Sequence, residues 1–186
     1  MRIFVKVLLG TIGSISWKSA STSTLALTDL RIYMGITPMT EASTISSWVS
    51  MDDLILVYST DSYTLGNVSG WETFYLDTPF EYDGSGNLVV VVAKKSGTYN
   101  SSVKYEYTTK SNRALYRRSD TYTDYASHPG TETGTRSSNL PNIKLAIGNP
   151  YDLCLPVSNI IATGMSSTGF TASWTPNAGE TSWIEI

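Results

Sequence analysis

The sequence is poor in the residues that would place it in several common classes of protein. Its 186 residues include one cysteine, Cys154, so no disulfide can form within the chain and stability must come from a packed core. Charged residues make up 16% of the chain and the net charge is −3. Lysine and arginine are scattered, which excludes a basic footprint for nucleic acid. No stretch approaches the roughly 20 apolar residues of a transmembrane helix, so we expect no membrane insertion.

Residues 70–93 carry the clearest strand pattern in the chain. Residues 71–76 are rich in aromatic and β-branched side chains, which is typical of a half-buried strand. Thr78-Pro79 is expected to end that strand, because proline cannot donate to a β-ladder. Residues 83–87 are a dense turn signal. Residues 88–92 are a continuous apolar run, typical of a strand buried on both faces, so the stretch predicts a central hairpin.

Further strands are predicted where apolar and polar residues alternate. Together they make about eight strands with no clear helix, which indicates an all-β fold. Strand and loop lengths are too uneven for an up-and-down barrel, so we expect a jelly-roll β-sandwich over residues 1–148. The polar segments 61–69 and 120–139 are predicted to be a turn region and a long loop. The strands are expected at 11–18, 25–35, 54–58, 71–76, 88–92, 103–109, 113–118 and 142–147.

The two ends of the chain suggest that it belongs to a longer protein. Lys6 interrupts the apolar N-terminal run and no small-residue cleavage site follows, so we expect the chain to start inside a domain rather than with a signal peptide. Pro150 and Pro156 mark a boundary, and residues 149–156 are predicted to be a linker. A second strand pattern follows over residues 157–186.

That second pattern resembles the opening of a fibronectin type III module. The family begins with a proline-led strand, followed by a strand of small and apolar residues that ends in a buried tryptophan. The resemblance implies only the first strands of such a module, and three strands cannot bury a core alone. The matching positions are Pro156, Ile160, Phe170, Ala172 and Trp174, and Trp183 and Ile184 would open the next strand.

Residues 1–148 also carry a resemblance, in three stretches. They are LRIYMG from Leu30, GWETFYLDTPFEYDGSGNLVVVV from Gly70 and NRALYRRSD from Asn112. They are similar to jelly-roll, galactose-binding-like modules that precede fibronectin type III repeats in large secreted surface proteins of Bacteroidota. Cleaved-adhesin domains of secreted proteases are related to that group. The resemblance implies a bacterial, non-catalytic module of a multidomain protein that is secreted or displayed at the cell surface.

The residues offer little for nucleophilic catalysis. A hydrolase triad needs a base, and the one histidine, His128, precedes Pro129 in a polar loop. The chain has no G-x-S-x-G nucleophile elbow. Cys154 lies between two leucines and is predicted to pack as a small hydrophobe. One cysteine and one histidine do not make a zinc site, so we expect no enzyme activity and no catalytic residues.

The carboxylates are expected mainly in turns, with a metal site as the alternative. Asp52 and Asp53 are adjacent and are expected in a loop, and Asp83-Gly84 is expected to be a turn. Structural calcium is the alternative, because it binds carboxylate and carbonyl oxygens on loops. Asp120 and Asp124 would supply part of that metal site. No other cofactor is expected.

Sugar binding needs exposed aromatic rings for the apolar face of a pyranose and planar polar groups for its hydroxyls. Such residues gather around the long polar loop. In the alternative reading Tyr116 belongs to the core and the arginines pair with Asp120 and Asp124. Trp17, Trp48 and Trp71 are predicted to pack in the core or at sheet edges. The candidate ligand-binding residues are Arg113, Tyr116, Arg117, Arg118, Tyr122, Tyr125 and Arg136.

Together these features predict a non-catalytic extracellular binding or adhesion module. Carbohydrate is the leading ligand class, a cell-surface protein is a further candidate partner, and other domains of the same parent chain would lie beside it. The alternative is an architectural spacer or accessory domain of a larger secreted enzyme, such as a protease or glycoside hydrolase. Exposed aromatic residues beside residues 113–136 would favour a sugar. A surface on which every tyrosine is buried would favour a spacer.

Overall fold

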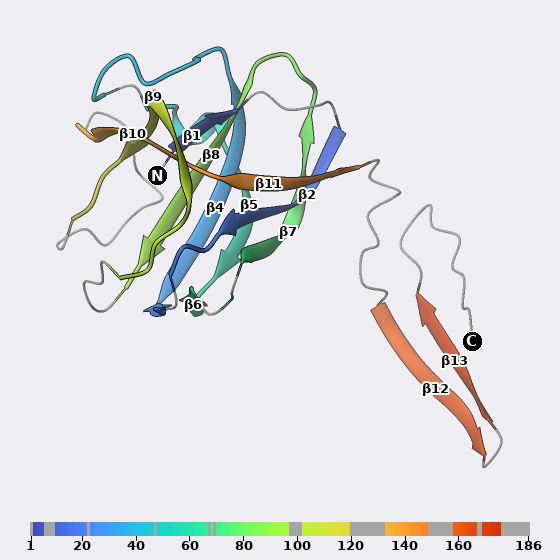
Figure 1. The fold of residues 1–186 in the computed structure, drawn as a ribbon. Helices are drawn as coiled ribbons and strands as arrows, with labels where there is room; N and C mark the ends of the chain where they lie inside the picture. The colour runs from blue at the N-terminus through green and yellow to red at the C-terminus, as the bar shows by residue number, and fades with distance from the viewer. Residues whose placement is uncertain are drawn as a thin grey trace. The chain divides into compact units, whose positions relative to one another are not determined.

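The computed structural model of the chain divides into two compact units, Met1–Ile147 and Gly148–Ile186. It describes residues 2–5, 10–21, 23–46, 48–66, 68, 70–96, 102–119, 133–148, 158–166 and 169–175. The first unit contains β1 to β11 and a short 3₁₀ turn, η1 (Figure 1). Their bounds are β1 Arg2–Val5, β2 Gly10–Lys18, β3 Leu25–Leu27, β4 Asp29–Thr37, η1 Met51–Asp53, β5 Ile55–Thr60, β6 Tyr63–Leu65, β7 Trp71–Tyr82, β8 Asn87–Lys95, β9 Tyr107–Tyr116, β10 Thr135–Pro141 and β11 Ile143–Gly148.

Two sheets form the body of the first unit. The six-stranded sheet, called sheet A, has the order β10-β9-β1-β8-β4-β5, and the three-stranded sheet, called sheet B, has the order β11-β2-β7. The short strands β3 and β6 pair with each other separately. The pairings of β1 with β8, β4 with β8 and β2 with β7 are all antiparallel. The all-β sandwich predicted from the sequence is confirmed.

The main core of the unit is built from residues of both sheets. Ile32 of β4 is fully buried, and Phe74 of β7 is 3% exposed. The ring of Phe74 lies 5.4 Å from Trp17, 5.5 Å from Tyr58 and 5.0 Å from Tyr63, measured between ring centroids. Aromatic pairs at these separations add to the stability gained from burial alone. This cluster holds the inner face of β7 firmly in the core.

A second, smaller core covers the opposite face of sheet A. Val89 and Val91 of β8 and Leu115 of β9 pack there against Ala42 and Val49, which lie in the connection between β4 and β5. The alternate residues of β8 face the main core. The prediction that residues 88–92 form a strand buried on both faces is therefore confirmed for the run up to residue 91.

The predicted central hairpin is wrong in its pairing. β7 pairs with β2 in sheet B, whereas β8 lies between β1 and β4 in sheet A. The turn between them is formed as expected: Gly84 has a φ of 72°, and the carboxylate of Asp83 accepts a hydrogen bond of 2.8 Å from the Ser85 amide. A tight turn can connect two sheets as well as two neighbours in one sheet. The faces of β8 are buried by the two cores, whereas its two edges are paired with β1 and β4.

Thr78-Pro79 does not end β7, which continues to Tyr82. Ser14 pairs with Tyr75 and Ile12 with Phe80, so β7 bulges between those two pairs. Pro79 falls inside this bulge, on an edge strand of sheet B. Its missing N–H therefore removes no ladder hydrogen bond.

Several other boundaries differ from the predictions. Residues 25–35 form two strands, β3 and β4, and residues 61–69 include the short strand β6. Residues 103–109 and 113–118 contribute to a single strand, β9. The predicted loop 120–139 overlaps β10, which pairs with β9. β10 was hidden by its polar composition, because it is an edge strand of sheet A, and β6 was hidden because it is only three residues long.

The second unit contains an antiparallel pair, β12 Ser158–Ser166 and β13 Gly169–Thr175. Ala162 pairs with Ala172, and the register shifts on both sides of that region. The linker predicted at 149–156 and the strand predicted at 182–186 lie outside the described residues.

Candidate functional site

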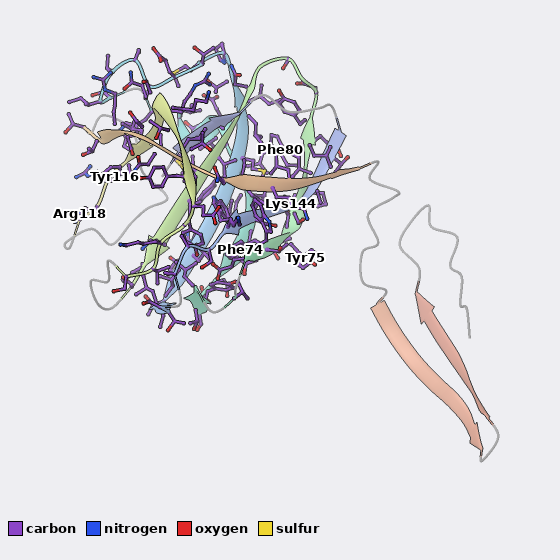
Figure 2. All side chains as sticks on the ribbon, viewed as in Figure 1. Phe74, Tyr75, Phe80, Tyr116, Arg118 and Lys144 are labelled. Atoms are coloured by element: carbon purple, nitrogen blue, oxygen red, sulfur yellow. The ribbon has the colours of Figure 1, made fainter. Side chains whose placement is uncertain are left out.

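The candidate site predicted from the sequence centres on the ends of β9 and β10. Tyr116 is the last residue of β9, is 41% exposed and pairs with Thr135. Arg117 and Arg118 follow it and are exposed. Figure 2 shows Tyr116 and Arg118 on the same side of the unit. The structure therefore places an accessible aromatic ring and, two residues further along the chain, an exposed arginine on one side of the unit.

The two remaining arginines of this site take part in local structure. Arg136, opposite Leu115, donates a hydrogen bond of 3.1 Å to the carbonyl of Ser43. Arg113 is half-buried where β9 bulges, next to Asn112, whose φ is 55°. The carbonyl of Asn112 accepts a hydrogen bond from the Ala42 amide. Arg136 and the β9 bulge thus tie sheet A to the connection that covers its second core.

Four of the predicted site residues, Asp120, Tyr122, Asp124 and Tyr125, lie outside the described residues, as do His128 and Cys154. The calcium prediction therefore stays a prediction. Within the described part of the chain, no group of three or more histidine, cysteine, aspartate or glutamate residues comes together to hold a metal.

The described aspartates have structural roles. Asp52 and Asp53 lie in the exposed turn η1, where the amide of Asp52 donates to the Ser50 hydroxyl. Asp77 accepts a hydrogen bond of 2.9 Å from the Ser59 amide of β5. The amide and hydroxyl of Ser85 lower the pKa of Asp83 by stabilising its charged form. Through their carboxylates, Asp77 and Asp83 thus stabilise a strand edge and a turn.

A surface that the sequence did not point to lies on the outer side of sheet B. It consists of three residues of β7 that point away from the core, together with their partners on β2. We call it the Trp71 face. Tyr75 is 76% exposed and Trp71 is 40% exposed, and Figure 2 shows Tyr75 on the opposite side of the unit from Tyr116. The residues of the Trp71 face are Trp71, Thr73 and Tyr75 of β7 and Lys18 of β2, together with Ser14 and Ser16 of β2, which lie between the larger side chains and are only 7% and 4% exposed.

The Trp71 face was missed because both sides of β7 carry aromatic residues. The prediction of core or edge packing is confirmed for Trp17, which is 7% exposed, and for Trp48, which packs on the second core. Trp71 lies on the edge strand β7, as predicted, and is 40% exposed. The alternation at 71–76 was a usable signal, since it places Trp71, Thr73 and Tyr75 on one side.

A buried carboxylate lies directly behind the Trp71 face. Glu72 is 1% exposed, and its two oxygens accept hydrogen bonds of 3.1 Å and 3.3 Å from the Gly66 amide. The hydroxyl of Tyr105 also donates to it. Burial, followed by the charge of Glu72 and a hydrogen bond to it, raises the pKa of Tyr63 to about 12. These partners satisfy the carboxylate, so it acts as a structural tie for β7.

No protein-family model, curated protein or solved structure matches this chain. In the part of the chain that the structure describes, no helix is long and apolar enough to cross a membrane.

Proposed function

We propose that the first unit is a non-catalytic binding module of a secreted or surface-displayed protein and that its ligand is a carbohydrate. The observation that carries the proposal is the exposed ring of Tyr116 at the end of β9, beside the exposed Arg118. A tyrosine ring can stack on the apolar face of a sugar, and a guanidinium can donate several hydrogen bonds to its hydroxyls.

Two further features support binding over a purely architectural role. The first is that Tyr75 and Tyr116 are exposed, whereas a spacer is expected to have every tyrosine buried. The second feature is that the site stands on the paired strands β9 and β10, and that Arg136 of β10 is hydrogen-bonded to the carbonyl of Ser43. A rigid support reduces the entropy lost on binding.

The resemblance of the chain to jelly-roll modules followed by fibronectin type III repeats supports the same setting. The antiparallel pair β12–β13 is compatible with the opening strands of such a repeat. In this proposal the first unit presents the ligand site, and β12 and β13 belong to a fibronectin type III module. The ligand site and the fibronectin type III module are both proposals.

A glycan-array screen of the full chain tests the proposal, run once with calcium and once with EDTA. We expect binding to a defined set of glycans. The Tyr116→Ala variant should lose about tenfold in affinity, roughly the 1.4 kcal/mol that one stacked ring contributes. Tyr107→Ala is the matched control, because Tyr107 lies at the other end of β9 and is 53% exposed.

Each outcome has a distinct meaning. Silence on the array from a folded sample would overturn carbohydrate binding and favour the architectural role. Equal losses from both tyrosine variants would mean non-specific adhesion rather than a site at Tyr116. Binding that requires calcium would support an ion held by Asp120 and Asp124.

A further inference from the structure

The Trp71 face presents a regular pattern of side chains along an edge strand. Trp71, Thr73 and Tyr75 point outward from β7, while Glu72 and Phe74 point into the core. At the rise of a β-strand, the Cα atoms of Trp71 and Tyr75 are separated by about 13 Å. Two aromatic rings with a hydroxyl between them therefore follow one straight line.

Polar groups border these rings in a defined arrangement. The hydroxyls of Thr73 and Ser16 lie 2.9 Å apart and are hydrogen-bonded to each other; Thr73 is exposed, whereas Ser16 is 4% exposed. Lys18 pairs across the ladder with Trp71, and its Nζ lies 3.0 Å from Oε2 of Glu106. Both members of that ion pair are about 40% exposed and remain accessible to a ligand. Sugar rings bind to surfaces on which apolar rings alternate with hydrogen-bonding groups.

Other occupants match this face less well. A protein interface has a contiguous apolar centre, but the exposed Thr73 separates the two rings. A polyanion needs unpaired positive charge, whereas Lys18 is paired with Glu106 and the whole chain carries a net charge of −3. The face is therefore close to neutral and mixed in polarity, which fits an uncharged, hydroxyl-rich chain.

We infer that the Trp71 face is a second binding surface, which accepts an extended, neutral polysaccharide lying along β7 with sugar rings stacked on Trp71 and Tyr75. The inference rests on the proposed function for the class of ligand, but it uses a different surface from that of Tyr116. The buried Glu72, next to Trp71 on the inner side, holds this part of β7 in place through Gly66 and Tyr105.

Depletion assays with insoluble cellulose, chitin and xylan test the inference, together with affinity electrophoresis in soluble neutral polysaccharides. The full-length chain is expected to bind at least one of them. Trp71→Ala and Tyr75→Ala should each weaken that binding about tenfold or more, and Tyr75→Phe should retain it because the ring remains. Ile45→Ala is the matched control, because it removes another exposed apolar side chain, 46% exposed, away from both proposed surfaces, and it should bind like the wild type. Circular dichroism and thermal melting establish that each variant is folded.

The results separate this inference from the proposed function. Polysaccharide binding that is unchanged in the folded Tyr75→Ala variant would overturn the inference. Array binding that depends on Tyr116, without any polysaccharide binding, would overturn the inference and leave the proposed function standing. Binding of polysaccharide that requires Trp71 and Tyr75, with a silent array, would support the Trp71 face and reject the Tyr116 site. Concentration-dependent dimerisation abolished by Tyr75→Ala would show that a second copy occupies the face, and would overturn the inference.

Discussion

The hydroxyl of Tyr105 donates a hydrogen bond to the carboxylate of Glu72, which is buried on the inner side of β7. The two residues are 33 positions apart in the sequence. The same carboxylate accepts from the Gly66 amide, so one side chain connects three separate segments. Trp71, the preceding residue, faces the other way. The hydrogen bonds of Glu72 therefore hold the part of β7 that carries the exposed Trp71 ring, and Glu72 itself takes no part in the outer surface.

Removing this carboxylate should destabilise the first unit. Glu72→Ala leaves the Tyr105 hydroxyl and the Gly66 amide without their buried acceptor, which should cost about 3 kcal/mol in the free energy of unfolding. Urea unfolding followed by tryptophan fluorescence measures this loss. Glu41→Ala is the control, because Glu41 is exposed, and it should change stability by less than about 0.5 kcal/mol. A Glu72→Ala loss as small as that of the control would show that the tie does not stabilise the fold.

Stability should fall at alkaline pH. Burial and the nearby Glu72 raise the pKa of Tyr63 to about 12 from the ordinary value of 10.0, and burial raises that of Tyr105 as well. The native state therefore favours the neutral phenols. Their contribution is fully present below about pH 10 and is lost as the pH rises from there towards the native pKa. Melting temperatures between pH 8 and pH 12 should decline over that window. The decline should be shallower in Tyr63→Phe, and an equal slope would contradict the assignment.

Two glycines with positive φ should respond differently to alanine. Gly66 has a φ of 75°, and a Cβ there would collide with the backbone carbonyl of Ser23. Gly70 has a φ of 92°, but a Cβ there would meet no atom within 4 Å. Gly70→Ala should therefore cost only the backbone strain, about 1 kcal/mol, and Gly66→Ala clearly more. Differential scanning fluorimetry of the two variants gives the comparison. Equal shifts in melting temperature would mean that the collision at Gly66 is relieved.

The second core on sheet A should contribute measurably to stability. Val89 is fully buried against the connection between β4 and β5, so Val89→Ala should cost about 2 kcal/mol through lost burial and the resulting cavity. Val68→Ala makes the same chemical change at a residue that is 41% exposed, and it should be nearly neutral. Urea unfolding of both variants measures the difference. A neutral Val89→Ala would show that the connection does not pack firmly on the sheet.

Much of the strand content was predictable, because it depends on patterns within a few residues. The alternation at 142–147 correctly placed Ile143, Leu145 and Ile147 towards the core and Lys144 outward. β10 was missed because a polar edge strand carries a weak pattern, and β6 because three residues are too few to show one. Within the predicted site, the exposure of Tyr116 agrees with the sequence argument. The contact of Arg136 with Ser43 was not predictable, since its partner is distant in the chain.

The sequence by itself determined the all-β character of the chain, the two-sided burial of β8 and the grouping of Trp71, Thr73 and Tyr75 on one side of a strand. Only the tertiary structure decided that β7 and β8 enter different sheets and that the side bearing Trp71 faces outward. The physical reason is that a period of two residues defines which side chains share a face. Which face is covered depends on partners that fold onto it from distant parts of the chain. On β7 the partners Gly66 and Tyr105 donate hydrogen bonds to the buried Glu72. Its place in the core could not be inferred from the sequence, because glutamate is polar.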